Sequence, residues 1–250
     1  MPEPKVILIT GASRGIGATL ARNFARKGHR VVINYLNSET QAFTLRNEIV
    51  ARFGRDAALA VRADVADRLE AGRMFDAIYE RYGRLDVLIN NAGINRDKTF
   101  LEMNDKMWSE VLRTILTGTF VCSQEFASRF SGAEGHIVTL GALTGISGRE
   151  NGVNYCTARA GILALTKCLA LELAPRIRVN CVTSGYIATE EVVERYQLQK
   201  QENYEQAIGA IPLGTLGAPE DIFRMMDFLV NESTYITGQN FLVDGGKLMR

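Results

Sequence analysis

A tyrosine and an arginine lie four residues apart in the stretch NYCTARAG, at Tyr155 and Arg159. Four residues span about one turn of an α-helix, so both side chains would project from the same helix face. A phenol can donate a proton, and a cation beside it favours the ionised phenol. The pair is therefore a candidate for acid catalysis. The alternative is that Tyr155 only lines a cleft and that Arg159 only anchors a ligand.

A glycine-rich stretch, TGASRGIG, runs from Thr10 to Gly17, between the apolar run KVILIT and a helical pattern. Gly11 would permit the turn, Gly15 would let the backbone approach a pyrophosphate, and Gly17 would allow close packing of helix on strand. The free N–H groups and the positive dipole end of the helix would then face the phosphates. We therefore expect a dinucleotide-binding turn; the alternative is a glycine-rich turn without a ligand.

Strand and helix patterns alternate along the chain, which indicates where these residues sit. Short apolar runs predict strands at KVILIT, RVVIN, AALAVRAD, LDVLINN, HIVTL and IRVNCV, with GQNFLVDGG as a closing strand. Helical spacing is found near residues 15–28, 38–53, 67–82, 103–130 and 152–174. Such alternation predicts an α/β fold, a doubly wound parallel sheet with helices on both faces. Residues 1–250 would form one domain, with 187–217 as an insertion that shapes a substrate loop.

Composition narrows the classes of function. The chain of 250 residues is 46% hydrophobic and 23% charged, and 29 basic side chains nearly balance 28 acidic ones. A nucleic-acid binder with a basic surface is therefore not expected. The longest apolar run is interrupted by Lys167 and Glu172, so we expect no membrane span.

Cysteines and histidines are few and scattered. The four cysteines form no CxxC pair, and His29 and His136 lie far apart in the sequence. We therefore expect no metal site and interpret the cysteines as reduced, buried thiols of a cytoplasmic protein.

Four stretches together resemble the classical short-chain dehydrogenases/reductases: TGASRGIG, NNAG at residues 90–93, YCTAR, and ITGQNFLVDGG. NNAGINRD followed by MWSEVL is most similar to the branch of 3-oxoacyl-acyl-carrier-protein reductases and acetoacetyl-CoA reductases. The resemblance covers essentially the whole chain. It implies a single Rossmann domain with a parallel seven-stranded sheet, usually assembled as a tetramer through its long helices. The implied substrate is a small molecule or an acyl group bound to a carrier protein.

The resemblance also implies a nicotinamide cofactor. Members specific for NAD carry an acidic residue at the end of the second strand, where this chain has Asn34 in VINYLNS. Arg14 in the glycine turn can pair with a 2′-phosphate, so NADP(H) is favoured over NAD(H); the alternative is that Arg14 is only a solvated surface charge. The implied cofactor residues are Gly11, Ser13, Arg14, Gly15, Ile16, Gly17, Asn34, Asp64, Val65, Asn91, Ala92, Gly93, Tyr155, Arg159, Ile187 and Thr189.

Catalysis in this family uses an asparagine, a serine, a tyrosine and a lysine. The resemblance gives the tyrosine the role of proton donor, the serine that of holding the substrate oxygen, the lysine that of binding the ribose, and the asparagine that of holding a relay water. Here only Tyr155 is kept: the lysine is Arg159, the serine is Ala142 and the asparagine is Ile115. Arginine keeps the charge but does not release a proton. Loss of one donor to a developing oxyanion costs about 10²–10³ in rate.

Two hydroxyls near Ala142, those of Thr144 and Ser147, are alternatives for the missing serine, although neither is in register. Three functions stay open. The first is an NADPH-dependent reductase with weakened or altered chemistry, acting on a ketone or on an alkene conjugated to a carbonyl. The second is a silent subunit that joins an active paralogue in a mixed tetramer, as an alternative to a homotetramer. The third is a regulator that senses the cofactor.

Overall fold

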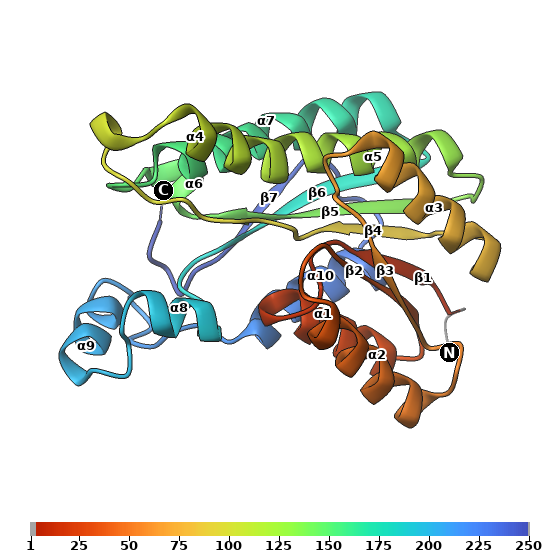
Figure 1. The fold of residues 1–250 in the computed structure, drawn as a ribbon, viewed down its shortest axis with the longest axis horizontal. Helices are drawn as coiled ribbons and strands as arrows, with labels where there is room; N and C mark the ends of the chain where they lie inside the picture. Colours follow the sequence, from red (N-terminus) through yellow and green to blue (C-terminus); the bar gives the residue numbers. More distant parts are fainter. Residues whose placement is uncertain (1–3, 250) are drawn as a thin grey trace.

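The computed structural model of this protein describes residues 4–249, which contain one seven-stranded sheet. All strand pairs are parallel, and the order across the sheet is β3-β2-β1-β4-β5-β6-β7 (Figure 1). The strands are β1 (Val6–Ile9), β2 (Arg30–Tyr35), β3 (Ala58–Arg62), β4 (Val87–Asn90), β5 (Gly135–Ala142), β6 (Ile177–Ser184) and β7 (Asn240–Val243). The predicted α/β fold with a seven-stranded parallel sheet is confirmed.

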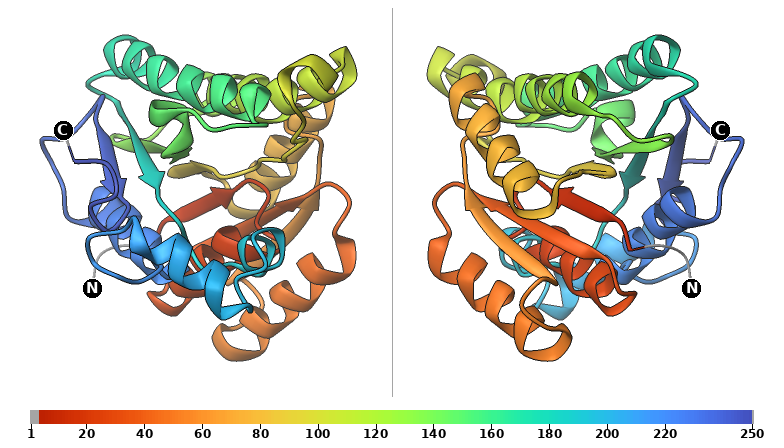
Figure 2. Two further views of the ribbon diagram at one scale, coloured as in Figure 1. Left: turned by 90° about the vertical axis from the view of Figure 1, so that its left-hand side faces the viewer. Right: turned by 90° about the vertical axis from the view of Figure 1, so that its right-hand side faces the viewer.

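Helices cover both faces of the sheet, as Figures 1 and 2 show. One layer holds α1 (Gly15–Arg26), α2 (Glu39–Phe53) and α10 (Pro219–Asn231). The other holds α3 (Arg68–Tyr82), α4 (Asp105–Leu112), α5 (Gly118–Arg129) and α7 (Val153–Leu173). A short helix, α6 (Thr144–Ser147), follows β5, and α8 (Glu190–Arg195) and α9 (Gln201–Gly209) follow β6.

Strand β1 shows why the runs are apolar without alternation. Ile7 and Ile9 pack into the core on the side of α1, whereas Val6 and Leu8 pack into the core on the side of α3 and α5. All four side chains are completely buried. A parallel strand covered on both faces needs apolar residues at every position. The carboxyl ends of these strands, and the loops that follow them, form one edge of the sheet.

The long helix expected near 103–130 is interrupted. A 3₁₀ turn, η1 (Phe100–Glu102), precedes α4, and a π-helical turn, η2 (Arg113–Thr117), separates α4 from α5. The Thr119 hydroxyl donates to the carbonyl of Ile115 within this turn, at 2.7 Å. A 3₁₀ or π turn changes the number of residues per turn only slightly and over a few residues. Hydrophobic periodicity does not detect so small a change, so the sequence pattern is that of one helix.

Residues 187–217 contain two helices, α8 and α9, and no strand apart from one bridge. Ile187 and Gly217 form a parallel bridge, and the N–H of Ala188 donates to the Gly217 carbonyl at 2.8 Å. The two ends of the segment are therefore held together. Helix α10 has no counterpart among the predicted elements; it begins with Pro219 in the first helical turn, where the missing N–H costs nothing.

The expectation that all four thiols are buried is wrong for two of them. Cys122 and Cys181 are buried, and burial raises the pKa of the Cys122 thiol to about 12 and that of Cys181 to about 11. Cys156 is half-buried and Cys168 is exposed, because α7 turns those positions away from the sheet. Within residues 4–249, no cluster of histidine, cysteine and carboxylate side chains could hold a metal ion, and no helix is long and apolar enough to cross a membrane.

Candidate functional site

A cavity of about 880 Å³ lies along the carboxyl edge of the sheet, between the glycine turn, α6, the start of α7 and α8. In doubly wound sheets, ligands bind at this edge, where the strand order reverses on either side of β1. Every predicted cofactor residue except Gly17 lines this cavity, and so do Ala142, Thr144 and Ser147. The fold therefore brings together residues that the sequence separates by up to 178 positions, from Gly11 to Thr189.

The glycine turn packs directly against the end of β4. Gly11 has a φ of +61°, and a Cβ there would lie 2.9 Å from the Cα of Ala92. A Cβ on Gly17 would lie 2.8 Å from the Cα of Ala12 and 2.7 Å from the side-chain nitrogen of Asn91. Gly17 is therefore needed for close packing, not as a wall of the cavity. No side chain caps the start of α1, so its first N–H groups keep their hydrogen-bonding capacity for a ligand.

Two predicted cofactor residues also hold the turn in place. The Asn34 side chain is only 2% exposed; its oxygen accepts the Gly11 N–H at 3.1 Å, and its nitrogen donates to the Ala63 carbonyl at 3.0 Å. The Asn91 side chain donates to the carbonyls of Thr10 and Gly11 at 2.8 and 3.0 Å. These amides fix the ends of β1, β2 and β4 relative to one another.

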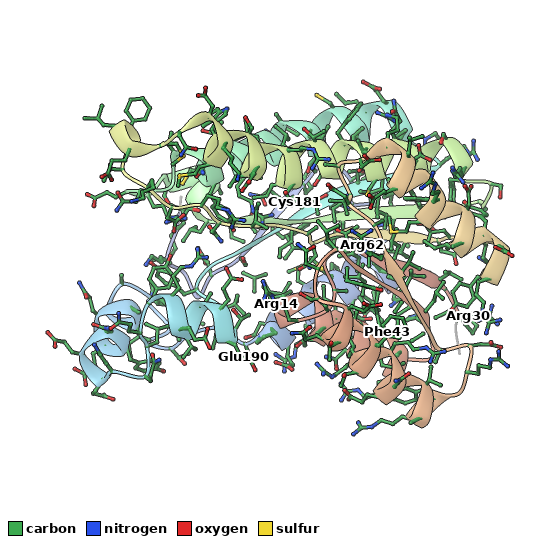
Figure 3. All side chains as sticks on the ribbon, in the orientation of Figure 1. Arg14, Arg30, Phe43, Arg62, Cys181 and Glu190 are labelled. Atoms are coloured by element: carbon green, nitrogen blue, oxygen red, sulfur yellow. The ribbon has the colours of Figure 1, made fainter. Side chains whose placement is uncertain are left out.

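Arg14 lies at the start of α1 with its side chain exposed, as Figure 3 shows together with Glu190 at the start of α8. None of the ion pairs formed within residues 4–249 involves Arg14. Asp64 differs, because its carboxylate pairs with Arg113 at 2.7 Å. Arg14 is thus available to an anion in the cavity.

Tyr155 and Arg159 come together at the other end of the cavity. The Arg159 guanidinium carbon lies 5.1 Å from the centre of the Tyr155 ring, and one of its terminal nitrogens donates to the Leu140 carbonyl. Arg159 is 5% exposed, and its Nε has no hydrogen-bond partner among the described residues. A Cβ on Gly93 would lie 2.8 Å from the guanidinium, so this glycine makes room for the larger cation.

A second arginine, which our sequence analysis did not identify, lies over the same ring. The Arg149 guanidinium carbon is 5.5 Å from the centre of the Tyr155 ring. Both terminal nitrogens of Arg149 bind the Asp97 carboxylate, at 2.6 and 2.9 Å, and one of them donates to the Asn95 side chain at 3.1 Å. The one signal in the sequence is that Arg149 stands six positions before Tyr155, in GRENGVNY.

The two positions predicted to replace the family's serine and asparagine carry no polar side chain. Ala142 lies at the end of β5 and lines the cavity. Ile115 is completely buried in η2 and packs in an apolar cluster with Val111, Ala158 and Ile162. The Ile115 side chain itself offers no group that could hydrogen-bond a water.

The two alternative hydroxyls differ in their bonding. The Ser147 hydroxyl donates to its neighbours, the carbonyls of Leu143 and Gly148, at 3.4 and 3.1 Å. The buried Thr144 hydroxyl has no hydrogen-bond partner among residues 4–249. Of the two, only the hydroxyl of Thr144 is left unsatisfied beside the cavity.

Comparisons with known proteins agree with this geometry. A family model described as enoyl-(acyl carrier protein) reductase matches residues 11–247. A 3-oxoacyl-(acyl-carrier-protein) reductase of Synechocystis sp. is 38% identical, with 98% of this chain and 97% of the relative covered. The enzyme of the same name from Staphylococcus aureus is also 38% identical, with both chains fully covered, and that of Aquifex aeolicus is 38% identical over 98% of this chain and 97% of its own. The chain belongs to the short-chain dehydrogenase/reductase family, within the group that this family model describes.

Proposed function

We propose that this protein is an NADP(H)-dependent reductase of 3-oxoacyl thioesters whose turnover is weakened by the changes at Ala142, Ile115 and Arg159. The observation that carries the proposal is one cavity of about 880 Å³ that joins the uncapped glycine turn to Tyr155 and Arg159. Support also comes from the relatives, which are named as 3-oxoacyl-(acyl-carrier-protein) reductases along their full length.

The residues present fit a dinucleotide. The N–H groups at the start of α1 suit a pyrophosphate, and the exposed guanidinium of Arg14 suits a 2′-phosphate. At the far end, the buried Nε of Arg159 lacks a partner that a ribose hydroxyl would provide. We assign the remaining predicted residues, from Ser13 to Thr189 but without Gly17, to the walls of the same site. A bound nicotinamide would supply the hydride.

Tyr155 is the proton donor of the proposed reaction. Its hydroxyl gives a proton to the ketone oxygen as the carbonyl carbon gains hydride, which produces the alcohol. The guanidinium groups of Arg149 and Arg159 lie 5.5 and 5.1 Å from the ring centre and hold the ring in place. Arg159 does not pass a proton on, so Tyr155 regains its proton more slowly than it would through a lysine.

The substrate oxygen has one donor fewer than in the family pattern. Ala142 provides no hydrogen bond, and the loss of one such donor typically reduces the rate by about 10²–10³. Thr144 lines the cavity near this position, and its hydroxyl has no hydrogen-bond partner among residues 4–249. We expect substrates that are easily reduced to depend least on this missing donor.

A silent subunit of a mixed tetramer is the second candidate function. It is favoured by the complete burial of Ile115 among apolar side chains, because isoleucine cannot hydrogen-bond a relay water. Large apolar side chains are also exposed on the helices that would form an interface, such as Phe120 on α5 (41%) and Leu171 on α7 (84%).

One assay separates the two functions. The purified protein is mixed with NADPH and a 3-oxoacyl thioester, and the nicotinamide absorbance is followed over time. Slow turnover that disappears in Tyr155→Phe supports the reductase. Tight binding of NADPH without any turnover, together with a recovered activity when an active relative is co-expressed, supports the silent subunit. The absence of NADPH binding contradicts both.

A further inference from the structure

A second cavity of about 440 Å³ lies beneath α8 and α9, at the end of the molecule where Figure 1 shows this pair of helices. Four residues, which we name the junction residues, line both this cavity and the larger one: Tyr186, Arg195, Tyr196 and Lys247. The junction residues thus connect the region around Tyr155 with a further compartment. None of the four was identified from the sequence.

The second cavity is lined mainly by polar side chains. Besides the junction residues, it is lined by Gln197, Leu198, Asn203, Gln206 and Ala207. The rings of Tyr186 and Tyr196 meet edge to face, with centres 5.6 Å apart. A plain alkyl chain in this compartment would desolvate amide groups without giving them hydrogen bonds, which costs free energy. The lining therefore suits a polar ligand.

Lys247 is a partly buried cation at this junction. Its ammonium nitrogen lies 4.2 Å from the centre of the Tyr186 ring, and no carboxylate within residues 4–249 forms an ion pair with it. Desolvation by burial lowers the pKa of Lys247, an effect that nearby Asp244 partly offsets. The Asp244 carboxylate accepts the N–H groups of Gly246 and Leu248, at 2.9 and 2.8 Å, and so is held by the backbone.

Two other cations that line the large cavity at this end, Arg149 and Arg195, are paired with carboxylates. Arg149 binds Asp97 through two nitrogens, at 2.6 and 2.9 Å. Arg195 binds Glu191 at 2.8 Å and reaches the same Asp97 at 3.5 Å. Two carboxylates therefore offset these two guanidinium groups. Lys247, by contrast, has no carboxylate partner among residues 4–249, and it lies where the two cavities meet.

We propose that Lys247 binds an oxyanion of the substrate, a carboxylate or a phosphate, at the junction of the two cavities. The inference rests on the proposed reductase function and makes Lys247 a specificity-determining residue. A compact ammonium on a flexible stem suits such groups, and contact with the Tyr186 face holds it without consuming its hydrogen-bond donors. The oxyanion has two sources, a carboxylate at the far end of the acyl chain or the phosphate of a pantetheine arm.

Two matched pairs of substrate analogues distinguish the sources. The first pair is a 3-oxoacyl N-acetylcysteamine thioester that ends in a carboxylate and its methyl ester. The second pair is a 3-oxobutyryl thioester of 4′-phosphopantetheine and the same thioester of pantetheine. Affinities are measured by calorimetry for the full protein, with and without NADPH. The variants are Lys247→Gln, Lys247→Arg and, as a charge-matched control, Lys200→Gln, whose side chain is exposed and bonds only Gln197.

We expect the anionic member of at least one pair to bind roughly tenfold more tightly than its neutral partner, as one charge-assisted contact would give. Lys247→Gln should abolish that preference, whereas Lys247→Arg and Lys200→Gln should keep it. The responding pair identifies the source. The inference is overturned if neither pair shows a preference in the unaltered protein, or if Lys247→Gln retains it. Because NADPH binding is recorded in the same titrations, its absence would contradict the proposed function separately.

Discussion

The two ends of the large cavity are built by different means. At the glycine turn, the chain offers backbone N–H groups, and the side-chain amides of the buried Asn34 and the half-buried Asn91 hold the turn in place. At Tyr155, the proposed chemistry depends on side chains, and the resemblance to the family predicts that three of its four catalytic side chains are replaced. The elements that carry them are still present, with Ala142 at the end of β5 and Ile115 in η2.

The comparison shows that a scaffold and its functional groups change independently. At the glycine turn, the groups that would contact the ligand belong to the backbone. The main sequence requirement is therefore a glycine at each position where a Cβ would clash. At the Tyr155 end, Ala142 ends β5, Ile115 is buried in η2 and Arg159 is buried in α7. Gly93 and the Leu140 carbonyl accommodate Arg159 in particular. We therefore expect cofactor binding to be strong and catalysis to be weak.

The largest effect is expected from returning the family's catalytic residues to the Tyr155 end of the large cavity. The triple variant Ala142→Ser, Ile115→Asn, Arg159→Lys should raise turnover of a 3-oxoacyl thioester by about 10²-fold or more, because it returns an oxyanion donor and a proton relay. The double variant without Ile115→Asn guards against loss of folding, since Ile115 is completely buried among apolar groups. Ser147→Ala is the matched control, with little change expected. Unchanged turnover in the folded double and triple variants would contradict our assignment of these positions.

At the opposite end of the large cavity, one added methyl group should disrupt the glycine turn. In Gly17→Ala, the added Cβ would lie within 3.0 Å of the backbone of Ala12, so the glycine turn must shift. We expect the affinity for NADPH to fall by roughly 100-fold, measured by titration calorimetry. Gly72→Ala in α3 is the matched control, because its Cβ would meet only an arginine side chain at 3.7 Å. Equal affinities in the two variants would show that the turn does not hold the cofactor.

Much of this comparison could be predicted from the sequence, and the reasons for the rest are physical. The strands follow from apolar runs, and the position of the glycine turn at the end of β1 follows from glycine spacing. The altered family positions stay a prediction from motif register. Arg149 and Lys247 could not be predicted, because their roles arise from loops that bring distant side chains together over Tyr155 and Tyr186. The π-helical turn at Ile115 and the exposure of Cys168 depend on small rotations that periodicity does not encode.

A smaller effect should separate the two cofactors. Arg14→Gln removes the exposed charge at the start of α1, which has no ion-pair partner among residues 4–249. We expect the affinity for NADPH to fall by about tenfold and that for NADH to stay within about twofold, since only NADPH carries the 2′-phosphate. Competition titrations with both cofactors measure the ratio. An equal loss for both would assign Arg14 to the shared pyrophosphate instead.

The smallest expected effect is a pH dependence of stability, caused by His136 in the sheet that carries both ends of the large cavity. Burial, together with the positive charges of Arg178 and Lys5, lowers the pKa of His136 on β5 to about 3. The unfolded chain takes up a proton below its ordinary pKa of 6.5 while the folded protein does not, so stability is lost as the pH falls from about 6.5 towards 3. The loss is about 1.4 kcal/mol for each pH unit in that window.

Replacing the imidazole should remove this contribution. The free energy of unfolding is measured in urea at roughly pH 7.5 and pH 5 for the unaltered protein and for His136→Phe. Both proteins lose stability as the pH falls, and we expect the loss to be about 2 kcal/mol smaller in His136→Phe. Glu134, 4.0 Å from the His136 ring nitrogen, is exposed and would compensate only weakly for a charged imidazole. Parallel pH profiles for the two proteins would show that His136 does not titrate differently on folding.

The most direct test of the account is a calorimetric titration of the folded protein with NADPH and with NADH. We predict saturable binding of one NADPH per chain, tighter than that of NADH, because phosphate groups meet the uncapped start of α1 and the free guanidinium of Arg14. If neither dinucleotide binds at concentrations on the order of millimolar, the glycine turn is not a cofactor site and the proposed function is contradicted.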